Sequence, residues 1–413
     1  MSRRIGILAG PYRVDDQLGG IGLRLWEIAQ VLADAGHRVT IAAPHPSPFT
    51  HPGIRITTAP ARKVVDTCEV VLTTDLPDTT LLLHAHRTGV RIVAENAPPV
   101  EHLHYTTLTG DDGAELYRDT VARWRLQLLL ADHLLVRSEA EHASVLGALV
   151  TAGRMSVAHH QTDPGLAHLV SLVPLGFTRH AAATAATADA AAVVTEGACD
   201  LLWNGGVWDY CHPAPVLTAL ARLGPGAPVL RLMYAPSPGR RRALEEQAGR
   251  LGVGHLLRWP DKPVGHRERD GWVKAARALV FTGGRTAENA TCHRLRLRDA
   301  ALYRLPVVVD PYGASGDLVR ALGIGPVADP DTPDALAGAL LAATADGPPR
   351  TGYLTALDRA AGRFTLERTL RPLLAWLDTG HRAPDRNTPD LVRAVDGLLA
   401  AHPALTGPAP RLI

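Results

Sequence analysis

Short apolar segments alternate with segments of helical period along most of the chain, and this alternation restricts the possible folds more than any other feature. The first example leads from an apolar segment at 4–9, through Gly19-Gly20-Ile21-Gly22 and a helical pattern at 23–35, to a second apolar segment at 38–43. Further strands are predicted at 69–74, 90–95, 131–137 and 171–174, with a helix at 78–87. Strands and helices that alternate over short connections predict a parallel, doubly wound sheet.

A stretch rich in alanine and threonine divides the series into two parts. A chain of 413 residues exceeds what one hydrophobic core usually serves. We therefore predict an N-terminal Rossmann-like domain at 1–178, a linker or exposed connecting helix at 179–199, and a C-terminal Rossmann-like domain at 200–363. Strands of the second domain are expected from 201 onward and at 229–234, 256–259, 278–282 and 306–310. An amphipathic segment at 364–378 opens the remaining region, 364–413.

Charge and cysteine usage exclude several classes of function. The 43 basic and 41 acidic residues leave a net charge of +2, so no general attraction to nucleic acid or to an anionic membrane is expected. Four scattered cysteines, Cys68, Cys199, Cys211 and Cys292, lack the spacing of a metal site and indicate free thiols in a reducing cytoplasm. No apolar run approaches about 18 residues, so neither export nor a membrane span is expected.

Four motifs lie where chemistry is expected in such sheets, at or after strand ends. Gly19 and Gly20 precede a helix, and glycine there lets backbone amides at a helix N-terminus approach an anion. IVAENAPPVE at 92–101 ends a strand on Glu95, and LLWNGGVWDYCHP at 201–213 carries Gly205, Gly206 and Trp208. ENATCHRLRLRDAALYRLP at 288–306 is rich in arginine and carboxylate groups. The first, third and fourth of these motifs also have plainer interpretations, as a glycine turn, a core tryptophan and a pair of exposed arginines.

Through these motifs the sequence resembles the GT4 glycosyltransferases along most of its length. It is most similar to a bacterial subgroup with WNGGxWD and ExxxxxRxRxxD motifs. The resemblance implies the GT-B fold, an α/β architecture of two doubly wound Rossmann-like domains that face a central cleft. It also implies that RFTLERTLRPLLAWL, within 364–413, is a crossover helix and tail that return to the N-terminal domain.

The resemblance assigns donor binding to residues of both halves. In the family, the counterparts of Gly19 and Gly20 and of Gly205, Gly206 and Trp208 surround the donor diphosphate and sugar. The acidic and amide groups Glu288, Asn289 and Asp299 would complete the donor site. Many GT4 enzymes carry an Arg and a Lys after the first C-terminal strand, and this chain has neither, so we assign diphosphate binding and stabilisation of the leaving group to Arg294 and Arg296.

The spacing of acids in this region departs from the common family pattern. Most GT4 enzymes have two glutamates eight positions apart, of which the first binds the donor sugar and the second the nucleotide ribose. Aligned on LPVVV, Asp299 takes the place of the second, while Thr291 occupies the place of the first. The subgroup has its acid somewhat earlier, at the position of Glu288. The acceptor side is assigned to Glu95, which would face the cleft and orient an acceptor hydroxyl or amine, together with Asn96, Glu101 and His102.

The activity implied is metal-independent transfer of a sugar, with retention, from a nucleoside diphosphate sugar to a small acceptor such as an aminocyclitol of natural-product biosynthesis. No cofactor, metal, nucleic acid or membrane span is expected, and the protein is expected in the cytoplasm. The nucleotide base, the sugar and the oligomeric state stay open. The alternatives are a transferase of surface polysaccharides, a GT-B epimerase or phosphorylase, and a catalytically idle protein that binds a nucleotide sugar.

Overall fold

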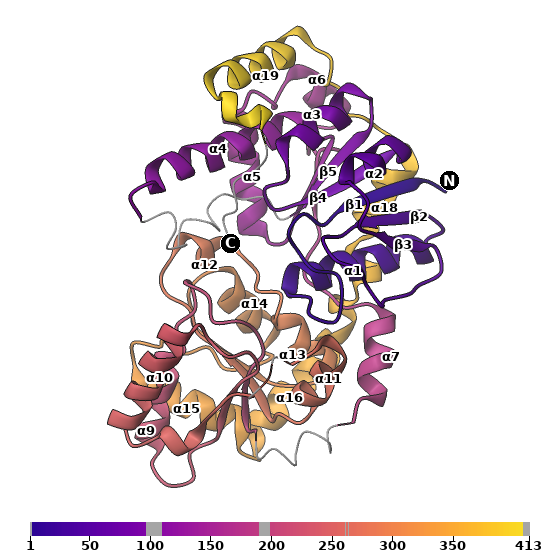
Figure 1. Cartoon of the computed structure of the whole chain (residues 1–413). Coiled ribbons are helices and arrows are strands. Elements are labelled where there is room, and N and C mark those ends of the chain that lie inside the picture. The colour runs from indigo at the N-terminus through magenta and orange to yellow at the C-terminus, as the bar shows by residue number, and fades with distance from the viewer. Residues whose placement is uncertain (1, 96–109, 190–198, 261, 263, 408–413) are drawn as a thin grey trace. The chain divides into compact units, whose positions relative to one another are not determined.

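The computed structural model describes residues 2–95, 110–189, 199–260, 262 and 264–407 (Figure 1). It divides into two compact units. Unit 1 comprises residues 1–174 together with 366–413, and unit 2 comprises residues 175–365. Unit 1 is therefore assembled from both ends of the chain, whereas unit 2 is continuous. Among the described helices, none has the length and apolar character needed to cross a membrane.

Unit 1 contains a seven-stranded parallel sheet with the strand order β3-β2-β1-β4-β5-β6-β7. Its elements before residue 174 are β1 (Arg4–Leu8), α1 (Gly20–Asp34), β2 (Arg38–Ala42), β3 (Ile54–Thr57), α2 (Ala61–Thr67), β4 (Val70–Thr74), α3 (Thr79–Arg87), β5 (Arg91–Glu95), α4 (Gly113–Leu130), β6 (His133–Val136), α5 (Glu139–Thr151), α6 (Val157–Thr162) and β7 (Val170–Leu172). The order turns back at β1, which lies between β2 and β4.

Each face of this sheet has its own hydrophobic core, because successive strand side chains point to opposite faces. Ile5, Ile7 and Leu72 pack with α1 on one face. Val71 and Ile92 pack on the other face with residues of α2, α3 and α4. The central strands are buried on both sides, as expected of a parallel sheet covered by helices.

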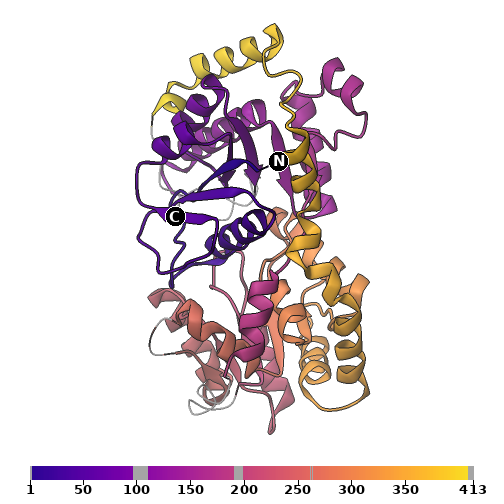
Figure 2. The same cartoon turned by 90° about the vertical axis from the view of Figure 1, so that its right-hand side faces the viewer.

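The C-terminal part of unit 1 contacts both of these cores. It contains α17 (Leu366–Thr369), α18 (Arg371–Thr379), α19 (Pro389–Ala401) and the 3-10 turn η5 (Pro403–Thr406). Leu373 and Trp376 of α18 join the core beside α1. Leu391 and Leu398 of α19 join the core beside α4, so the chain passes around the sheet between 379 and 389 (Figure 2).

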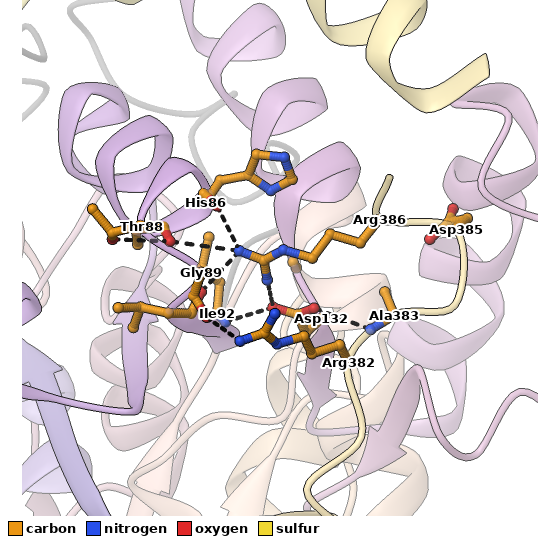
Figure 3. A network of polar contacts seen from close by, with 12 residues as sticks. His86, Thr88, Gly89, Ile92, Asp132, Arg382, Ala383, Asp385 and Arg386 are labelled. Atoms are coloured by element: carbon orange, nitrogen blue, oxygen red, sulfur yellow. Dashed lines mark hydrogen bonds and ion pairs between the residues drawn. The ribbon is translucent and has the colours of Figure 1, made fainter. Parts of the chain in front are cut away.

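Two buried ion pairs attach the segment between α18 and α19 to the rest of unit 1. Arg386 is paired with Asp132, which also accepts hydrogen bonds from Ile92 N (2.9 Å) and Ala383 N (3.0 Å) (Figure 3). Asp385 is paired with Arg154 (2.7 Å). All four of these charged side chains are buried. Arg386 further donates to the carbonyl groups of His86 (2.9 Å) and Val90 (3.0 Å), at the C-terminal end of α3.

Unit 2 contains a five-stranded parallel sheet with the order β10-β9-β8-β11-β12. Its elements are α7 (Arg179–Thr187), β8 (Leu201–Trp203), α9 (Ala214–Leu223), β9 (Leu230–Leu232), α10 (Pro238–Arg250), η3 (Gly254–Leu256), β10 (Leu257–Arg258), α11 (His266–Lys274), β11 (Ala278–Phe281), α12 (Ala287–Thr291), α13 (Leu297–Tyr303), β12 (Val307–Val309), α14 (Ala314–Leu322), α15 (Pro333–Thr344), α16 (Pro348–Ala360) and η4 (Ala361–Phe364). Here the order turns back at β8, between β9 and β11.

The two doubly wound sheets confirm the predicted fold class, with some local differences. The strand β3 was not predicted, because its sequence IRIT has one exposed and three half-buried positions and lacks a clear apolar signature. The segment predicted as a linker begins with the helix α7, which belongs to unit 2. The amphipathic segment at 364–378 is divided between α17 and α18, which belong to unit 1.

Candidate functional site

Two strand ends in unit 2 carry the same short pattern, a polar residue followed by two glycines. After β8 come Asn204-Gly205-Gly206, and after its neighbour β11 come Thr282-Gly283-Gly284. This is the point where the strand order turns back, which is where ligands bind in open α/β sheets. The two loops are joined by His212 N to Thr282 O (2.9 Å) and by a bridge between Cys211 and Gly283. They therefore form one continuous edge of unit 2, which we call the glycine edge.

Arg296 lies against this edge. Its guanidinium carbon is 5.4 Å from the ring centroids of both Trp203 and Phe281, the last residues of β8 and β11. Nη2 donates to Gly206 O (3.1 Å). A β-carbon at Gly205 would lie only 2.7 Å from the guanidinium, so this approach requires glycine there. The Nη1 atom is buried and has no hydrogen-bond partner among the described residues.

Asp299 lies behind Arg296 and has no exposed surface. Its carboxylate accepts from Asn204 Nδ2 (2.6 Å), from Arg298 Nη1 (3.1 Å) and from Arg269 Nη2. Burial acts to lower the pKa of Arg269, but Asp299, Tyr303 and other neighbouring groups together raise the pKa above its ordinary value. Direct contact between Asp299 and a ribose stays a prediction, and it would require this cluster to open.

Glu288, Asn289 and Arg294 form a second buried group in unit 2. Arg294 Nη1 donates to Glu288 Oε1 (2.5 Å), and Nη2 donates to Asn289 Oδ1. The guanidinium carbon also lies 3.8 Å from the ring centroid of Tyr210. Burial tends to lower the pKa of Arg294, but neighbouring groups including Cys292, Tyr210 and Glu288 raise it above its usual value. Asn289 Nδ2 in turn donates to Gly284 O (2.8 Å), which ties the group to the glycine edge.

Trp208 is exposed, with 49% of its surface accessible. Its indole packs so closely over Gly206 that a β-carbon there would lie 2.8 Å from the ring. The following residue, Asp209, is paired with Arg240, which also donates to Trp208 O (3.0 Å). An exposed, anchored indole beside the glycine edge can stack on a flat or apolar ligand face.

In unit 1, Gly19 and Gly20 lie at the N-terminus of α1. Gly19 is the N-cap residue, without a side-chain cap, and the first turn contains no acidic residue. Both glycines are exposed. The first amides of a helix lack intrahelical partners, so this end of α1 offers donors and a partial positive charge.

Glu95 ends β5 of the same unit and is almost fully buried, at 1% exposure. Its Oε1 accepts from Arg24 Nε of α1 (2.5 Å), and Arg24 Nη2 donates to Val173 O (3.1 Å). The arginine therefore connects α1 with the ends of two strands. The predicted contact between Glu95 and an acceptor stays a prediction. Asn96, Glu101 and His102 lie outside the described residues.

The structure thus places the predicted residues in separate groups. Arg296 and Asp299 lie with Gly205 and Gly206, and Arg294 lies with Glu288 and Asn289. Four residues of these sites were not predicted: Arg24, Asn204, Arg269 and Gly283. The repeated Gly-Gly pattern after β11 could have identified Gly283. Nothing local marks Arg24 or Arg269, because their partners Glu95 and Asp299 lie 71 and 30 positions away.

No protein-family model matches the chain, and no curated protein matches it by sequence. Solved structures do match over most of the chain. Trehalose-6-phosphate synthase OtsA aligns with a TM-score of 0.64 and 13% identity, covering 91% of this chain and 99% of its own. HepE from Anabaena, in complex with UDP-glucose, aligns with a TM-score of 0.61 and 16% identity, covering 91% of this chain and 100% of its own. WaaG, a glycosyltransferase involved in lipopolysaccharide biosynthesis, aligns with a TM-score of 0.61 and 15% identity, covering 90% of this chain and 98% of its own.

The chain has the GT-B fold. At these identities the likeness concerns the architecture alone. Within the GT-B fold, unit 1 provides the first doubly wound sheet and unit 2 the second.

Proposed function

We propose that the chain is a glycosyltransferase that uses a nucleoside diphosphate sugar and transfers the sugar to a small polar acceptor. The GT-B fold, shared with proteins solved with UDP or UDP-glucose, supports this proposal. The observation that carries it is the environment of Arg296 at the glycine edge of unit 2.

Arg296 differs from the other arginines of this edge in the way its charge is balanced. Arg269, Arg294 and Arg298 are each paired with a buried carboxylate. Arg296 has no carboxylate partner within the described part of the chain. It contacts a carbonyl group and two aromatic rings. A buried guanidinium N–H without a partner is costly, and a phosphate oxygen would satisfy both the donor and the charge.

The proposed donor site therefore centres on Arg296, Gly205 and Gly206, with Trp208 beside the nucleotide or the sugar. Arg294, Glu288 and Asn289 support the glycine edge from behind. Asp299 holds Asn204 and, through it, the start of the loop. At the N-terminus of α1 in unit 1, Gly19 and Gly20 stay predicted anion-binding residues.

The proposed reaction is transfer with retention and without a metal ion, as the resemblance to GT4 enzymes implies. The bond between the anomeric carbon and the diphosphate oxygen breaks, and a bond from that carbon to the acceptor oxygen or nitrogen forms on the same face. The acceptor's proton passes to the departing diphosphate. Arg296 stabilises the charge that develops on this leaving group, and electrostatic stabilisation of this kind is the largest contribution in many enzymes.

A cytoplasmic enzyme with a soluble acceptor, such as an aminocyclitol, is part of the proposal. All four cysteines are free, and three of them are buried. Burial raises the pKa of the Cys199 thiol to about 12, so this group stays protonated and unreactive at neutral pH. Free thiols of this kind are usual in a reducing compartment.

Calorimetric titration of the full chain with UDP, GDP, dTDP, ADP and NAD, in the presence of EDTA, tests the donor site. We expect one nucleoside diphosphate to bind at micromolar concentration. Arg296→Ala should weaken it by at least about tenfold, since hydrogen bonds to charged groups contribute roughly 1.5–3 kcal/mol. Arg241→Ala, which removes a half-exposed arginine of α10 paired with Glu245, is the matched control.

The outcomes separate the proposal from its alternatives. Binding of NAD alone, or of no nucleotide, would overturn the transferase proposal. Unchanged affinity in Arg296→Ala would overturn the site but leave the function standing. NMR of the sugar products distinguishes an epimerase, which changes the donor sugar without an acceptor, from a transferase that forms a new glycoside with the anomeric configuration of the donor.

A further inference from the structure

The sheet of unit 1 has its own point where the strand order turns back, between β1 and β4, and the two loops that follow are joined there. Tyr12, in the loop after β1, donates its hydroxyl hydrogen bond to the Asp75 carboxylate, in the loop after β4. Both residues are only partly buried. In open α/β sheets this carboxyl-terminal edge is the general place for ligands.

The backbone of Asp75 is held in an uncommon conformation. Its φ angle is +56°, in the left-handed region that side chains other than those of Gly, Asn and Asp rarely adopt. Asp75 N donates to Glu95 O (3.0 Å), and Gln127 Nε2 of α4 donates to Asp75 O (3.2 Å). Contacts from β5 and α4 thus fix the peptide groups on both sides of Asp75. A backbone fixed in this way holds the Asp75 carboxylate in one position before any ligand binds.

Three polar atoms of residues linked to this edge of the sheet are buried without a hydrogen-bond partner among the described residues. They are Thr74 Oγ1, Arg24 Nη1 and Gln127 Oε1. Their residues are 4%, 5% and 0% exposed. Thr74 precedes Asp75, Arg24 is bound to Glu95, which pairs with Thr74 in the sheet, and Gln127 bonds Asp75 itself. Buried polar atoms normally have partners, so three exceptions at one edge indicate a missing ligand or ordered water.

We propose that this edge of unit 1 binds a polyhydroxylated ring, with the Asp75 carboxylate accepting hydrogen bonds from ring hydroxyl groups. A carboxylate accepts from two neighbouring hydroxyl groups, and the Tyr12 oxygen, which donates to Asp75, can accept another. The inference rests on the proposed function, in which this ring is the acceptor. Glu95, which is buried and bound to Arg24, then positions Asp75 through its backbone carbonyl.

Saturation-transfer NMR on the full chain, with glucose, glucosamine and myo-inositol as separate probes at millimolar concentration, tests the site directly. We expect at least one probe to bind the wild-type protein. Asp75→Asn should raise its dissociation constant about tenfold or more, and Tyr12→Phe about threefold. Asparagine also tolerates a positive φ, so Asp75→Asn removes the charge and keeps the backbone conformation. Asp66→Asn, at a half-exposed carboxylate paired with His84 in the same unit, is the control.

A purely structural role for the Tyr12–Asp75 contact would change the melting temperature and leave probe binding alone. Melting temperature is therefore measured for every variant, together with UDP affinity. Equal probe binding by wild type and Asp75→Asn would overturn the inference, as would a wild-type protein that binds none of the three probes. Neither result would affect nucleotide binding by unit 2, so a wild type that fails to bind any nucleoside diphosphate would mark failure of the proposed function instead.

Discussion

Arginine side chains in this chain differ in how their charge is balanced. Arg154, Arg269, Arg294 and Arg386 are buried with carboxylate partners, and several of them also bond backbone carbonyl groups. Such pairs contribute little net stability, but removal of one member leaves an uncompensated charge. Arg296 lacks such a partner, and its position depends on the absence of a side chain at Gly205.

Gly205→Ala is expected to disturb the donor site without unfolding the protein. The added methyl group would meet the end of a flexible side chain, so the Arg296 guanidinium can move aside at little cost. Nucleoside diphosphate affinity should fall about tenfold, equivalent to about 1.4 kcal/mol. The free energy of unfolding should change by less than about 0.5 kcal/mol.

Calorimetry and urea unfolding measure the two quantities on the same samples. Gly239→Ala, in α10, is the control, because a β-carbon there meets nothing within 4 Å. A variant at Gly205 that kept wild-type affinity would contradict the position we assign to Arg296 in ligand binding.

Asp299→Asn is expected to lower stability as well as affinity. The substitution would leave Arg269 and Arg298 buried without their carboxylate, at a cost of about 3–5 kcal/mol. Urea unfolding, followed by a probe of unit 2 such as the fluorescence of Trp203, measures this loss. A residue that only contacted a ribose would lose affinity and keep its stability, so undiminished stability in Asp299→Asn would restore the direct role implied by the resemblance.

The sequence predicted which segments form the candidate site of unit 2 better than it predicted the contacts of each residue. Gly205, Gly206, Arg296 and Asp299 were recognised because they belong to local motifs. Their arrangement was not predictable, because it depends on contacts such as that of Asn204 with Asp299, 95 positions apart. The same reason hid the contact of Tyr12 with Asp75, which no short motif marks.

At the scale of elements, strand positions followed from apolar runs, and the predicted ends differed from the observed ones by one or two residues. The predicted segment 4–9 corresponds to β1, Arg4–Leu8, and 38–43 to β2, Arg38–Ala42. The missed strand β3 and the path of the chain around the sheet at 380–388 lack a periodic apolar signal. The C-terminal passage is held by charged side chains that a hydropathy pattern treats as surface.

Arg386→Ala is expected to destabilise unit 1 by about 3 kcal/mol. The substitution leaves Asp132, at 1% exposure, without its charged partner and removes bonds to the end of α3. Urea unfolding and limited proteolysis of 380–407 measure the effect. The matched control is Arg393→Ala in α19, whose side chain is 71% exposed and whose ion pair should be worth less than about 0.5 kcal/mol. Equal losses in both variants would contradict the role of the buried pair.

His133 should make unit 1 sensitive to acid. The ring is fully buried, stacks on Trp376 at 4.9 Å between centroids, and has its pKa lowered from 6.5 to about 4 by burial. Between pH 6.5 and 4, His133 is protonated in the unfolded chain and neutral in the native state. Stability should therefore be constant above about pH 7 and fall by up to about 3 kcal/mol as the pH approaches 4.

Unfolding free energies of wild type and His133→Phe across this range test the assignment. Phenylalanine retains an aromatic ring against Trp376 and cannot titrate. The slope of the unfolding free energy against pH should therefore be smaller than in the wild type. Part of it should persist, because burial also lowers the pKa of His86 to about 4. A slope equal to that of wild type would show that His133 does not contribute.

For the whole molecule, the two units differ in how their cores relate to chain order. The core of unit 2 is built entirely from residues 175–365. Both cores of unit 1 contain residues from its C-terminal segment, including Leu373 and Trp376 in one and Leu391 and Leu398 in the other. Each unit has the apolar interior expected of a domain, but only one of them is continuous in sequence.

Expression of fragments tests this difference. A fragment of residues 175–365 should fold cooperatively, whereas residues 1–174 alone should lack stable tertiary structure. Addition of a peptide spanning 366–407 should restore it, because the peptide supplies Asp385, Arg386 and the missing apolar side chains. Circular dichroism and two-dimensional NMR report each outcome, and a well-folded 1–174 fragment would contradict the prediction.

Assembly of unit 1 from both ends of the chain has a consequence for synthesis on the ribosome. The first 174 residues leave the exit tunnel long before Arg386 and the helices around it exist. At about 5–20 residues per second, translation of the intervening segment takes on the order of 10–40 s. During that interval residues 1–174 expose the apolar side chains that the C-terminal segment later covers. Unit 2, whose residues are all synthesised before this segment, can already fold. Nascent chains should therefore engage chaperones through the N-terminal sheet, and the last part made determines when the first becomes stable.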